Sequence, residues 1–349
     1  MTMKRIYMFV LMMCLLVTQL SAQQKYSSVV VGFYNLENLY DTILHPTNDD
    51  AAFTPNGSKS YTWDVFTDKI NKLATVISQI GTDVNPDGPA ILGVSEIENL
   101  SVLETLVNHP LLKERGYKIV HYDSKDFRGV DVAMLYNPKY FKVESSKPLF
   151  VQMPNGSKTS VFTRDILWVT GSLQGERVDV FVNHWPSRSG GEKRSMPARM
   201  AAAATARKTI DNIFKNNKDA KVIVMGDLND DPINESLTKG LKSVDAVQSI
   251  KPDELYNPWM SLYKKGIGTL AYQDAWSLFD QILISPGFID KKQDGFFYYK
   301  NQIFRQEYMV ENIGRYKGYP MRTYSGDVYR GGYSDHFPVY IVLLKRVME

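Results

Sequence analysis

Several apolar runs in this sequence end in short polar residues, the pattern of a site assembled where strands stop. The pair Asp335 and His336 directly precedes residues 337–343, where apolar residues alternate with others and predict a strand. An Asp-His pair held at a strand end can serve as a metal ligand or a general base. Taken alone, such a pair more often marks a polar loop before a core strand, so the hypothesis depends on what the rest of the chain supplies.

Five further apolar runs carry polar residues at a comparable place. These residues are Asn35 after residues 29–33, Glu96 after residues 90–94, His184 after residues 178–182, Asp227 and Asn229 after residues 222–225, and Asp280 near the start of residues 279–284. Strand ends that converge on one sheet edge would form a polar pocket on a rigid scaffold. The pocket would be rich in oxygen and free of thiolate, which favours hard cations such as magnesium, manganese or calcium over structural zinc.

Other segments would cover and connect these strands. Apolar residues step by four and three over residues 66–80, which predicts a covering helix with Thr62 as its N-cap. Residues 197–216 predict a second helix that begins at Pro197 and carries Arg199 and Arg207 on a solvated face.

Residues 117–143 resemble a hairpin, in which we interpret His121 and Tyr122 as structural residues.

The polar stretches, in this order, resemble the exonuclease-endonuclease-phosphatase family. Any one of these short motifs is weak evidence, but six in the correct order and spacing form a specific pattern. The matching pieces are Asn35, Ser95-Glu96, His184, Gly226-Asp227-Leu228-Asn229, Asp280 and Ser334-Asp335-His336, within residues 29–342. The resemblance implies an α/β (α+β) fold: a four-layer αββα sandwich of two packed, mainly antiparallel β-sheets flanked by helices.

The resemblance also implies metal-dependent hydrolysis of a phosphate ester. Glu96 would hold a Mg²⁺ ion, with Asn35 and Asp335 as further direct or water-mediated ligands; Mn²⁺ would serve as well, and Ca²⁺ is a further alternative. The ion would neutralise charge that develops on phosphorus or on the leaving oxygen.

The remaining site residues would act on the water and the phosphate. His336 would be a general base or a phosphate contact, oriented by Asp280, and Asp227 would position or deprotonate the attacking water. Asn229 and His184 would stabilise the transition state. The division of labour between Asp227 and His336 stays open.

Candidate phosphate contacts lie on the connecting loops. Arg128 follows a turn-rich patch, and its guanidinium fork could grip two phosphate oxygens, although a solvated turn arginine is an equal alternative. Ser187 and Arg188 are weaker candidates. The loop from Arg315 to Gly332, rich in tyrosine, leads directly into Asp335 and is the best candidate for substrate selection.

Length and composition favour one globular domain behind a leader. The chain has 349 residues, 44% hydrophobic and 23% charged, without a linker or repeat. Residues 1–22 have a charged, an apolar and a small-residue region, which predicts a signal peptide cleaved after Ala22 and a domain over residues 23–349. Cleavage would remove Cys14, the only cysteine, and release the protein to the periplasm or the medium; lipoprotein anchoring through Cys14 is less favoured.

The net charge of the chain narrows the range of possible substrates only slightly. Removal of Lys4 and Arg5 with the leader would lower the formal charge from +3 to +1, without the strong basic excess of many DNA-binding proteins. The leading hypothesis is a secreted endonuclease or phosphodiesterase acting on nucleic acid, as a monomer without a membrane span or an obligate protein partner. The alternatives are a phosphatase or phospholipase-C-like hydrolase of inositol phosphates or sphingomyelin, and a non-catalytic binding protein on the same scaffold.

Overall fold

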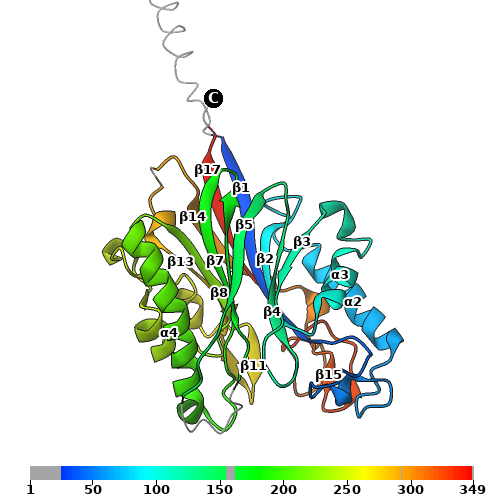
Figure 1. The fold of residues 1–349 in the computed structure, drawn as a ribbon. Helices are drawn as coiled ribbons and strands as arrows, with labels where there is room; N and C mark the ends of the chain where they lie inside the picture. The colour runs from blue at the N-terminus through cyan, green and yellow to red at the C-terminus, as the bar shows by residue number, and fades with distance from the viewer. Residues whose placement is uncertain (1–24, 155–161, 292, 348–349) are drawn as a thin grey trace, which may run out of the picture.

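Two β-sheets pack face to face, and helices cover their outer faces (Figure 1). The computed structural model describes residues 25–154, 162–291 and 293–347. The arrangement confirms the four-layer α/β sandwich expected from the sequence. The predicted signal peptide, residues 1–22, lies outside the described residues, so cleavage and export stay predictions.

The first sheet has six strands and is mainly antiparallel, with one parallel pair, β1 and β2. Its strands in spatial order are β14 (Phe297–Ile303), β17 (Val339–Arg346), β1 (Tyr26–Leu39), β2 (Pro89–Ile97), β4 (Asp131–Tyr136) and β3 (Lys118–His121).

The second sheet has seven strands, again mainly antiparallel, with β7 and β8 parallel at its centre. Its strands in spatial order are β5 (Phe141–Leu149), β6 (Ile166–Leu173), β7 (Glu176–His184), β8 (Lys221–Asp227), β13 (Asp280–Ile284), β10 (Leu255–Tyr256) and β9 (Ser243–Val244).

The strands are apolar on both faces because both faces are covered. Along β1, Val29, Val31 and Phe33 enter the core between the sheets, whereas Val30 and Tyr34 pack under helices. The covering helices are α2 (Trp63–Ile77) and α3 (Leu100–Val107) on the six-stranded sheet and α4 (Glu192–Asn216) on the seven-stranded sheet; α5 (Met260–Tyr263) is a single short turn.

Helix α2 begins as predicted, with Thr62 accepting a hydrogen bond from the backbone N–H of Val65 at 3.5 Å. Helix α4 differs from the prediction. It begins five residues earlier, at Glu192, so Pro197 lies inside it rather than in its first turn.

The expectation of a solvated face for Arg199 and Arg207 is wrong. Both side chains are buried, and Arg199 Nε lies 2.7 Å from Asp230 Oδ2. An arginine whose charge meets a buried carboxylate can occupy the inner face of a helix, and helical periodicity counts only the apolar residues there.

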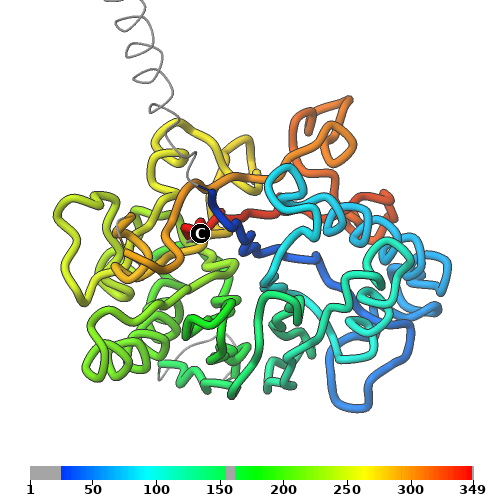
Figure 2. Tube along the Cα trace, turned by 90° about the horizontal axis from the view of Figure 1, so that it is seen from above, coloured from blue at the N-terminus to red at the C-terminus, as the bar shows by residue number. Residues whose placement is uncertain are grey.

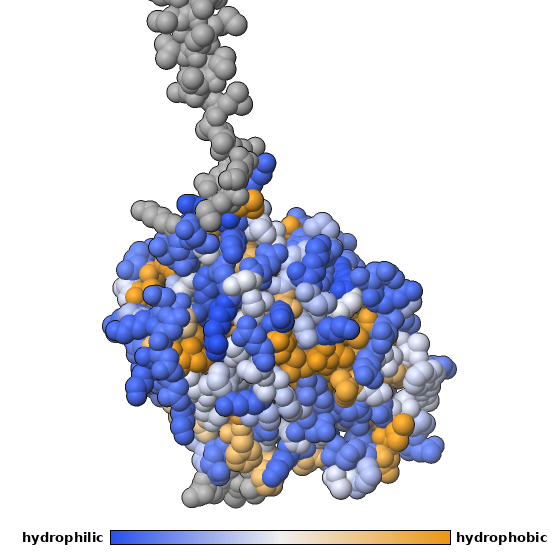
Figure 3. All heavy atoms as spheres, turned by 45° about the horizontal axis from the view of Figure 1, so that its top comes forward, coloured by the Kyte–Doolittle hydropathy of each residue, from blue (hydrophilic) through white to orange (hydrophobic). Residues whose placement is uncertain are grey.

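The described chain starts and finishes at one end of the sandwich. Strands β1 and β17 are paired antiparallel, and the N- and C-terminal segments lie side by side in both views (Figures 1 and 2). Figure 3 shows the face toward these ends, which is mostly polar, with apolar residues gathered in a few separate places.

Two small hairpins lie at the opposite end: β11 (Leu270–Tyr272) with β12 (Ala275–Ser277), and β15 (Tyr324–Ser325) with β16 (Val328–Tyr329).

Candidate active site

The polar residues predicted from strand ends meet at the end of the sandwich that carries the two hairpins. In the seven-stranded sheet, His184, Asp227 and Asp280 form one row, because His184 pairs with Asp227 and Asp227 pairs with Asp280 in adjacent strands. In the six-stranded sheet, Asn35 pairs with Ser95, the residue before Glu96. The two sheets thus present their polar strand ends to one another.

Two side-chain hydrogen bonds cross from one sheet to the other at this end. Asn35 Nδ2 donates to Asp227 Oδ2 at 3.0 Å, and His336 Nδ1 lies 2.7 Å from Asp280 Oδ2. Ser334 fixes the loop that carries His336, because its hydroxyl donates to the backbone carbonyl of Asn35 at 2.7 Å. The site is therefore built by both sheets together.

Backbone irregularities aim two of the predicted side chains. Glu96 and Asn229 have φ values of 59° and 50°, in the left-handed region that non-glycine residues rarely adopt. The β2–β4 pairing shifts register between Ser95 and Ile97, which places Glu96 in a bulge. Bulges redirect side chains near active sites, and strained backbone of this kind clusters at functional sites.

His336 and Asp227 have opposite protonation tendencies. Burial lowers the pKa of His336, but the carboxylates of Asp280 and Asp227 outweigh this and raise it well above the usual range. Burial raises the pKa of Asp227 to about 7, opposed by His336 and reinforced by Asp280 and Glu96. These shifts favour a cationic His336 beside a carboxyl group that can exchange a proton near neutral pH.

His184 is held neutral. Burial lowers its pKa well below the usual range, and the positive charges of Arg164 and Arg128 lower it further. Its Nε2 lies 3.6 Å from Asp227 Oδ2 and 3.8 Å from Glu96 Oε1, inside the cluster of acids. A neutral imidazole at this place can donate one hydrogen bond to a phosphoryl oxygen.

Arg164 supports His184 and was not predicted from the sequence. Its buried guanidinium donates to the backbone carbonyls of His184 and Trp185, at 3.2 and 2.6 Å, and to Asp126 Oδ2 at 3.1 Å. No motif marks this arginine, because it precedes β6 in an ordinary loop. It fixes the end of β7 to the loop that carries Arg128.

Thr269 completes the support of the histidine–carboxylate pair. Its hydroxyl donates to Asp280 Oδ2 at 2.5 Å, and its backbone carbonyl accepts from Phe337 N at 2.8 Å. Thr269 therefore contacts both Asp280 and the loop that carries His336.

The donor set fits a divalent cation. Glu96 uses Oε2 to accept from Asn38 N, which leaves Oε1 on the side of His184. Asp335 uses Oδ2 for Arg322 at 3.0 Å, which leaves Oδ1 at 4.0 Å from His336 Nε2. These two carboxylate oxygens are of the donor type that hard divalent ions prefer.

A second grouping of possible ligands overlaps the first. Single atoms of Asp227, Asp280 and His336 lie within 4.8 Å of one another and could also hold an ion. Asn35 accepts from Glu37 N through Oδ1 while it donates to Asp227, a member of this second grouping. The chain thus has acidic and histidine groups positioned to hold a metal ion.

Arg128 lies at the rim of this cluster. Burial lowers its pKa, but Glu96 and Asp126 outweigh this effect and raise it, so the guanidinium stays charged beside Glu96. Its Nε lies 3.4 Å from Asp126 Oδ1, and about a third of the side chain, 33%, is exposed. This position is accessible to a phosphate from solvent.

Ser187 and Arg188 lie further out on the loop after His184. Ser187 is exposed. Arg188 donates to the carbonyl of Asn229 at 3.0 Å and to Asp230 and Asp231 at 3.2 and 3.1 Å. The structure thus gives Arg188 the role of holding the loop after Asn229, and phosphate contact by Ser187 or Arg188 stays a prediction.

A cavity of about 700 Å³ opens beside Asp335. Its walls come from the hairpin β11–β12 and from the loop predicted to select substrate, with Tyr272, Tyr316, Arg315, Arg322 and Arg330 among its lining residues. Tyr272 is 72% exposed. A charged and aromatic wall of this size, next to a metal-binding cluster, is suited to binding the substrate beyond its phosphate.

Three buried groups anchor this loop. Thr323 N donates to Glu37 Oε2, and Lys69 Nζ donates to Thr323 Oγ1, both at 2.7 Å. Burial lowers the pKa of Lys69, and burial together with Asp335 raises that of Glu37 to about 7. The loop is therefore pinned to both β1 and α2.

Comparison with known proteins identifies the class. The profile of the Endonuclease/Exonuclease/phosphatase family matches residues 30–345, and the chain belongs to this family. It is therefore a hydrolase of phosphate ester bonds in a divalent-metal-dependent family. No curated protein matches the sequence.

Solved structures of related fold cover nearly the whole chain. An endonuclease/exonuclease/phosphatase family protein from Bacteroides thetaiotaomicron is 18% identical, with a TM-score of 0.57, over 93% of this chain and 100% of that one. A mannosyl-6-phosphatase from the same organism is 19% identical, with a TM-score of 0.54, over 92% and 100%. D. rerio TDP2 complexed with a single-strand DNA product is 14% identical, with a TM-score of 0.53, over 91% and 99%. At these identities the likeness concerns the fold.

Within the described part of the chain, none of the helices has the length and apolar character needed to span a bilayer.

Proposed function

We propose that this protein is a Mg²⁺-dependent phosphodiesterase that cleaves nucleic acid, with single strands as its preferred substrate. The observation that carries the proposal is the cavity that shares Asp335 with the metal-binding cluster and is lined by tyrosines and arginines together with the acids Asp274 and Glu311. Bases stack on aromatic side chains in single strands, and arginines neutralise the flanking phosphates.

The protein's own groups divide the chemistry between them. A divalent metal, when bound through Glu96, Asp335 and Asn35, supplies charge neutralisation at the phosphoryl oxygens. Asp227, whose pKa lies near 7, accepts the proton of the attacking water. His336, protonated by virtue of its raised pKa, donates from Nε2 to the phosphate.

The remaining groups grip and orient the substrate. His184 donates to a phosphoryl oxygen as a neutral imidazole, and Arg128 contacts the phosphate from the rim. Arg322 donates a hydrogen bond to Asp335 and also lines the cavity. It therefore aligns the carboxylate of a metal ligand while it faces the part of the substrate that follows the scissile bond.

A second candidate is a phosphatase that removes a monoester phosphate from a sugar. The specific observation in its favour is the volume of the cavity, about 700 Å³, which lies in the range of small-molecule sites. One of the proteins of similar fold is a mannosyl-6-phosphatase, which supports hydrolysis of a sugar phosphate monoester as the alternative reaction. An inositol phosphate or a lipid headgroup would use the same metal cluster.

The decisive experiment compares substrates. A labelled single-stranded oligonucleotide, its duplex form, a hexose 6-phosphate, an inositol polyphosphate and sphingomyelin are incubated with the protein in Mg²⁺, Mn²⁺ or EDTA. We expect metal-dependent cleavage of the single strand, lost in Glu96→Gln and retained in the neighbouring control Glu98→Gln. Release of inorganic phosphate from the monoesters with intact oligonucleotide would transfer the proposal to the phosphatase.

The cavity variant Tyr316→Ala separates the substrate from the chemistry. Loss of a stacking side chain should cost about 1–3 kcal/mol of oligonucleotide binding. It should leave cleavage of bis-p-nitrophenyl phosphate, which lacks bases, unchanged. Equal losses on both substrates would contradict base stacking in the cavity.

We further propose that the protein acts outside the cytoplasm, as a monomer, after loss of residues 1–22. The support is the charged and apolar pattern of the leader. Mass spectrometry of the secreted protein, with Gln23 as the expected first residue, and its elution volume test both statements.

A further inference from the structure

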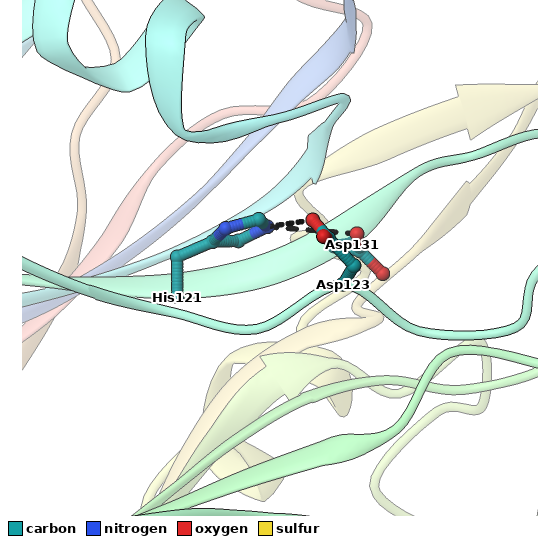
Figure 4. A group of neighbouring side chains, drawn as sticks. All are labelled: His121, Asp123 and Asp131. Carbon is teal, nitrogen blue, oxygen red and sulfur yellow. Dashed lines mark ion pairs between the residues drawn. The ribbon is translucent and has the colours of Figure 1, made fainter. Parts of the chain in front are cut away.

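Three possible metal ligands gather away from the site described above, at the base of the loop that carries Arg128. His121 ends β3 and Asp131 begins β4, and Asp123 lies two residues after His121. Figure 4 shows the imidazole of His121 pointing at the carboxylates of Asp123 and Asp131. His121 Nε2 lies 3.5 Å from Asp131 Oδ2 and 3.9 Å from Asp123 Oδ1.

These distances are too long for hydrogen bonds but fit ligands around a shared ion. Two ligands bound about 2.0–2.1 Å from a tetrahedral zinc ion lie roughly 3.3 Å apart. One ligand atom from each residue lies within 4.8 Å of the other two. Asp131 keeps Oδ2 available because its other oxygen, Oδ1, accepts from Ser124 N at 2.9 Å.

The histidine is an independent sign of a ligand. The side chain of His121 is only 5% exposed, and Nε2 has no hydrogen-bond partner among the described residues. A buried imidazole nitrogen aimed at two carboxylates without a hydrogen bond carries a desolvation cost that a bound cation would remove. Asp131 is equally buried at 5%, whereas Asp123, at 87% exposed, leaves the group open to solvent.

Asp165 extends the group. Its Oδ1 is buried and lacks a hydrogen-bond partner in the described part of the chain. Asp131 and Asp165 line the same small cavity of about 10 Å³, close to the volume that holds one water molecule. A water in this cavity could complete the coordination of an ion.

We propose that His121, Asp123 and Asp131 form a second divalent-metal site, suited to Zn²⁺ or Mn²⁺. Imidazole with carboxylates is a donor set for these ions, whereas Mg²⁺ and Ca²⁺ prefer oxygen alone. The proposal is independent of the substrate of the enzyme.

The ion would close the loop of residues 122–130. His121 and Asp131 lie on the two sides of this loop, and the loop itself carries Asp123, Asp126 and Arg128. Asp126 in turn contacts Arg164, which holds the carbonyls of His184 and Trp185. A cation at the base would therefore stabilise the position of Arg128 and the contact that links the loop to β7.

Calorimetric titration of chelator-treated protein with Zn²⁺ tests the site. The proposal predicts that His121→Gln lowers the number of bound equivalents by one, both in the wild-type and in the Glu96→Gln background. Comparison in both backgrounds separates this site from the active site. The matched control His109→Gln, which changes a histidine on another surface, should leave the number unchanged.

A second variant guards against misfolding. Asp123→Asn changes an exposed side chain, so the fold should be kept while affinity falls. Loss of groups that merely orient metal ligands costs about 10–100-fold, so loss of a ligand should weaken binding by at least tenfold. Cobalt substitution gives an optical readout, because the absorption of tetrahedral Co²⁺ should disappear with His121.

Two results would overturn the proposal. One is an unchanged number of equivalents in folded His121→Gln. The other is complete loss of Zn²⁺ binding in the Glu96→Gln variant, in which His121 is intact. Either would leave the group as an ion pair between His121 and Asp131.

Discussion

His336 and Asp280 join the two sheets through one short contact: Nδ1 of the histidine lies 2.7 Å from Oδ2 of the carboxylate. Asp280 is the first residue of β13 in the seven-stranded sheet, and His336 lies in the loop before β17 in the six-stranded sheet. Both side chains are buried. The contact fixes the tautomer and direction of the imidazole and thereby directs Nε2 toward the substrate.

Replacement of the carboxylate should impair catalysis more than folding. In Asp280→Asn the neutral amide no longer raises the pKa of His336 by its charge, so the cationic imidazole is less stable and less firmly oriented. We expect kcat to fall by on the order of a hundredfold or more, the usual contribution of a positioned acid or base. Steady-state kinetics on bis-p-nitrophenyl phosphate, with circular dichroism for the fold, measures the effect.

Asp179→Asn is the matched control. Asp179 is equally buried in β7 and accepts from Trp168 Nε1 and Thr170 Oγ1, away from the site. Its replacement should lower stability and leave kcat nearly unchanged. Similar kcat losses in both variants would contradict a special role for Asp280.

Arg164 should be critical for stability. Arg164→Met leaves Asp126 and two backbone carbonyls without their buried donor, and loss of one partner of a buried pair typically costs about 3–5 kcal/mol. Urea unfolding measures the change. The control is Arg177→Met, because Arg177 is 67% exposed in its 3.7 Å pair with Asp179 and should contribute at most about 1 kcal/mol. Equal effects of the two changes would refute the structural role of Arg164.

The acid stability of the protein should depend on Glu176. Burial raises the pKa of Glu176, but the ammonium groups of Lys221 and Lys345 and the N–H of Phe296 outweigh this and lower it. A depressed pKa means that the stabilisation is present above the unfolded value, about 4.3, and is lost as the pH falls through the folded value.

Glu176→Gln should therefore lower stability at pH 7 by about 1–3 kcal/mol and flatten the loss of stability below pH 4.5. Urea unfolding between pH 3 and 7 tests this. Parallel stability curves for both proteins would show that Glu176 makes no pH-dependent contribution.

The position of the loop that lines the cavity beside the site should depend on Thr323. Thr323→Val removes the hydroxyl that accepts from Lys69 and leaves that buried ammonium without this partner. We expect faster hydrogen exchange over residues 315–332 and a higher KM with a smaller change in kcat. Thr105→Val, on α3, is the control. A kcat loss without a KM change would argue that the loop contributes to chemistry instead.

Much of the site followed from the sequence because each member was attached to a strong local signal. Apolar strands ending in Asn35, Glu96 and His184 are recognisable by period and length, and strand ends of one sheet must meet at an edge. The same logic placed Asp280 near the start of a strand over residues 279–284, and the structure has it as the first residue of β13.

The rest required tertiary contacts that leave no local signal. No local motif marks Arg164 or Lys69, yet each is buried because a distant carboxylate or hydroxyl meets it. The left-handed backbone of Glu96 and Asn229 is likewise set by the bulge and turn around it. Arg188 had the right chemistry for phosphate, and only the folded loop revealed its acidic neighbours.

The pairing of β1 with β17 makes the described chain nearly a closed ring. Val347 N donates to Lys25 O at 3.0 Å, so the two ends of the described chain touch. From Tyr26 to Asn35, β1 covers about 30 Å, which separates these ends from the catalytic groups. Because the ends touch, a short peptide could join them and new termini could be opened elsewhere on the surface. Because the ends lie far from the catalytic groups, a fusion partner attached at either end would leave the substrate entrance unobstructed.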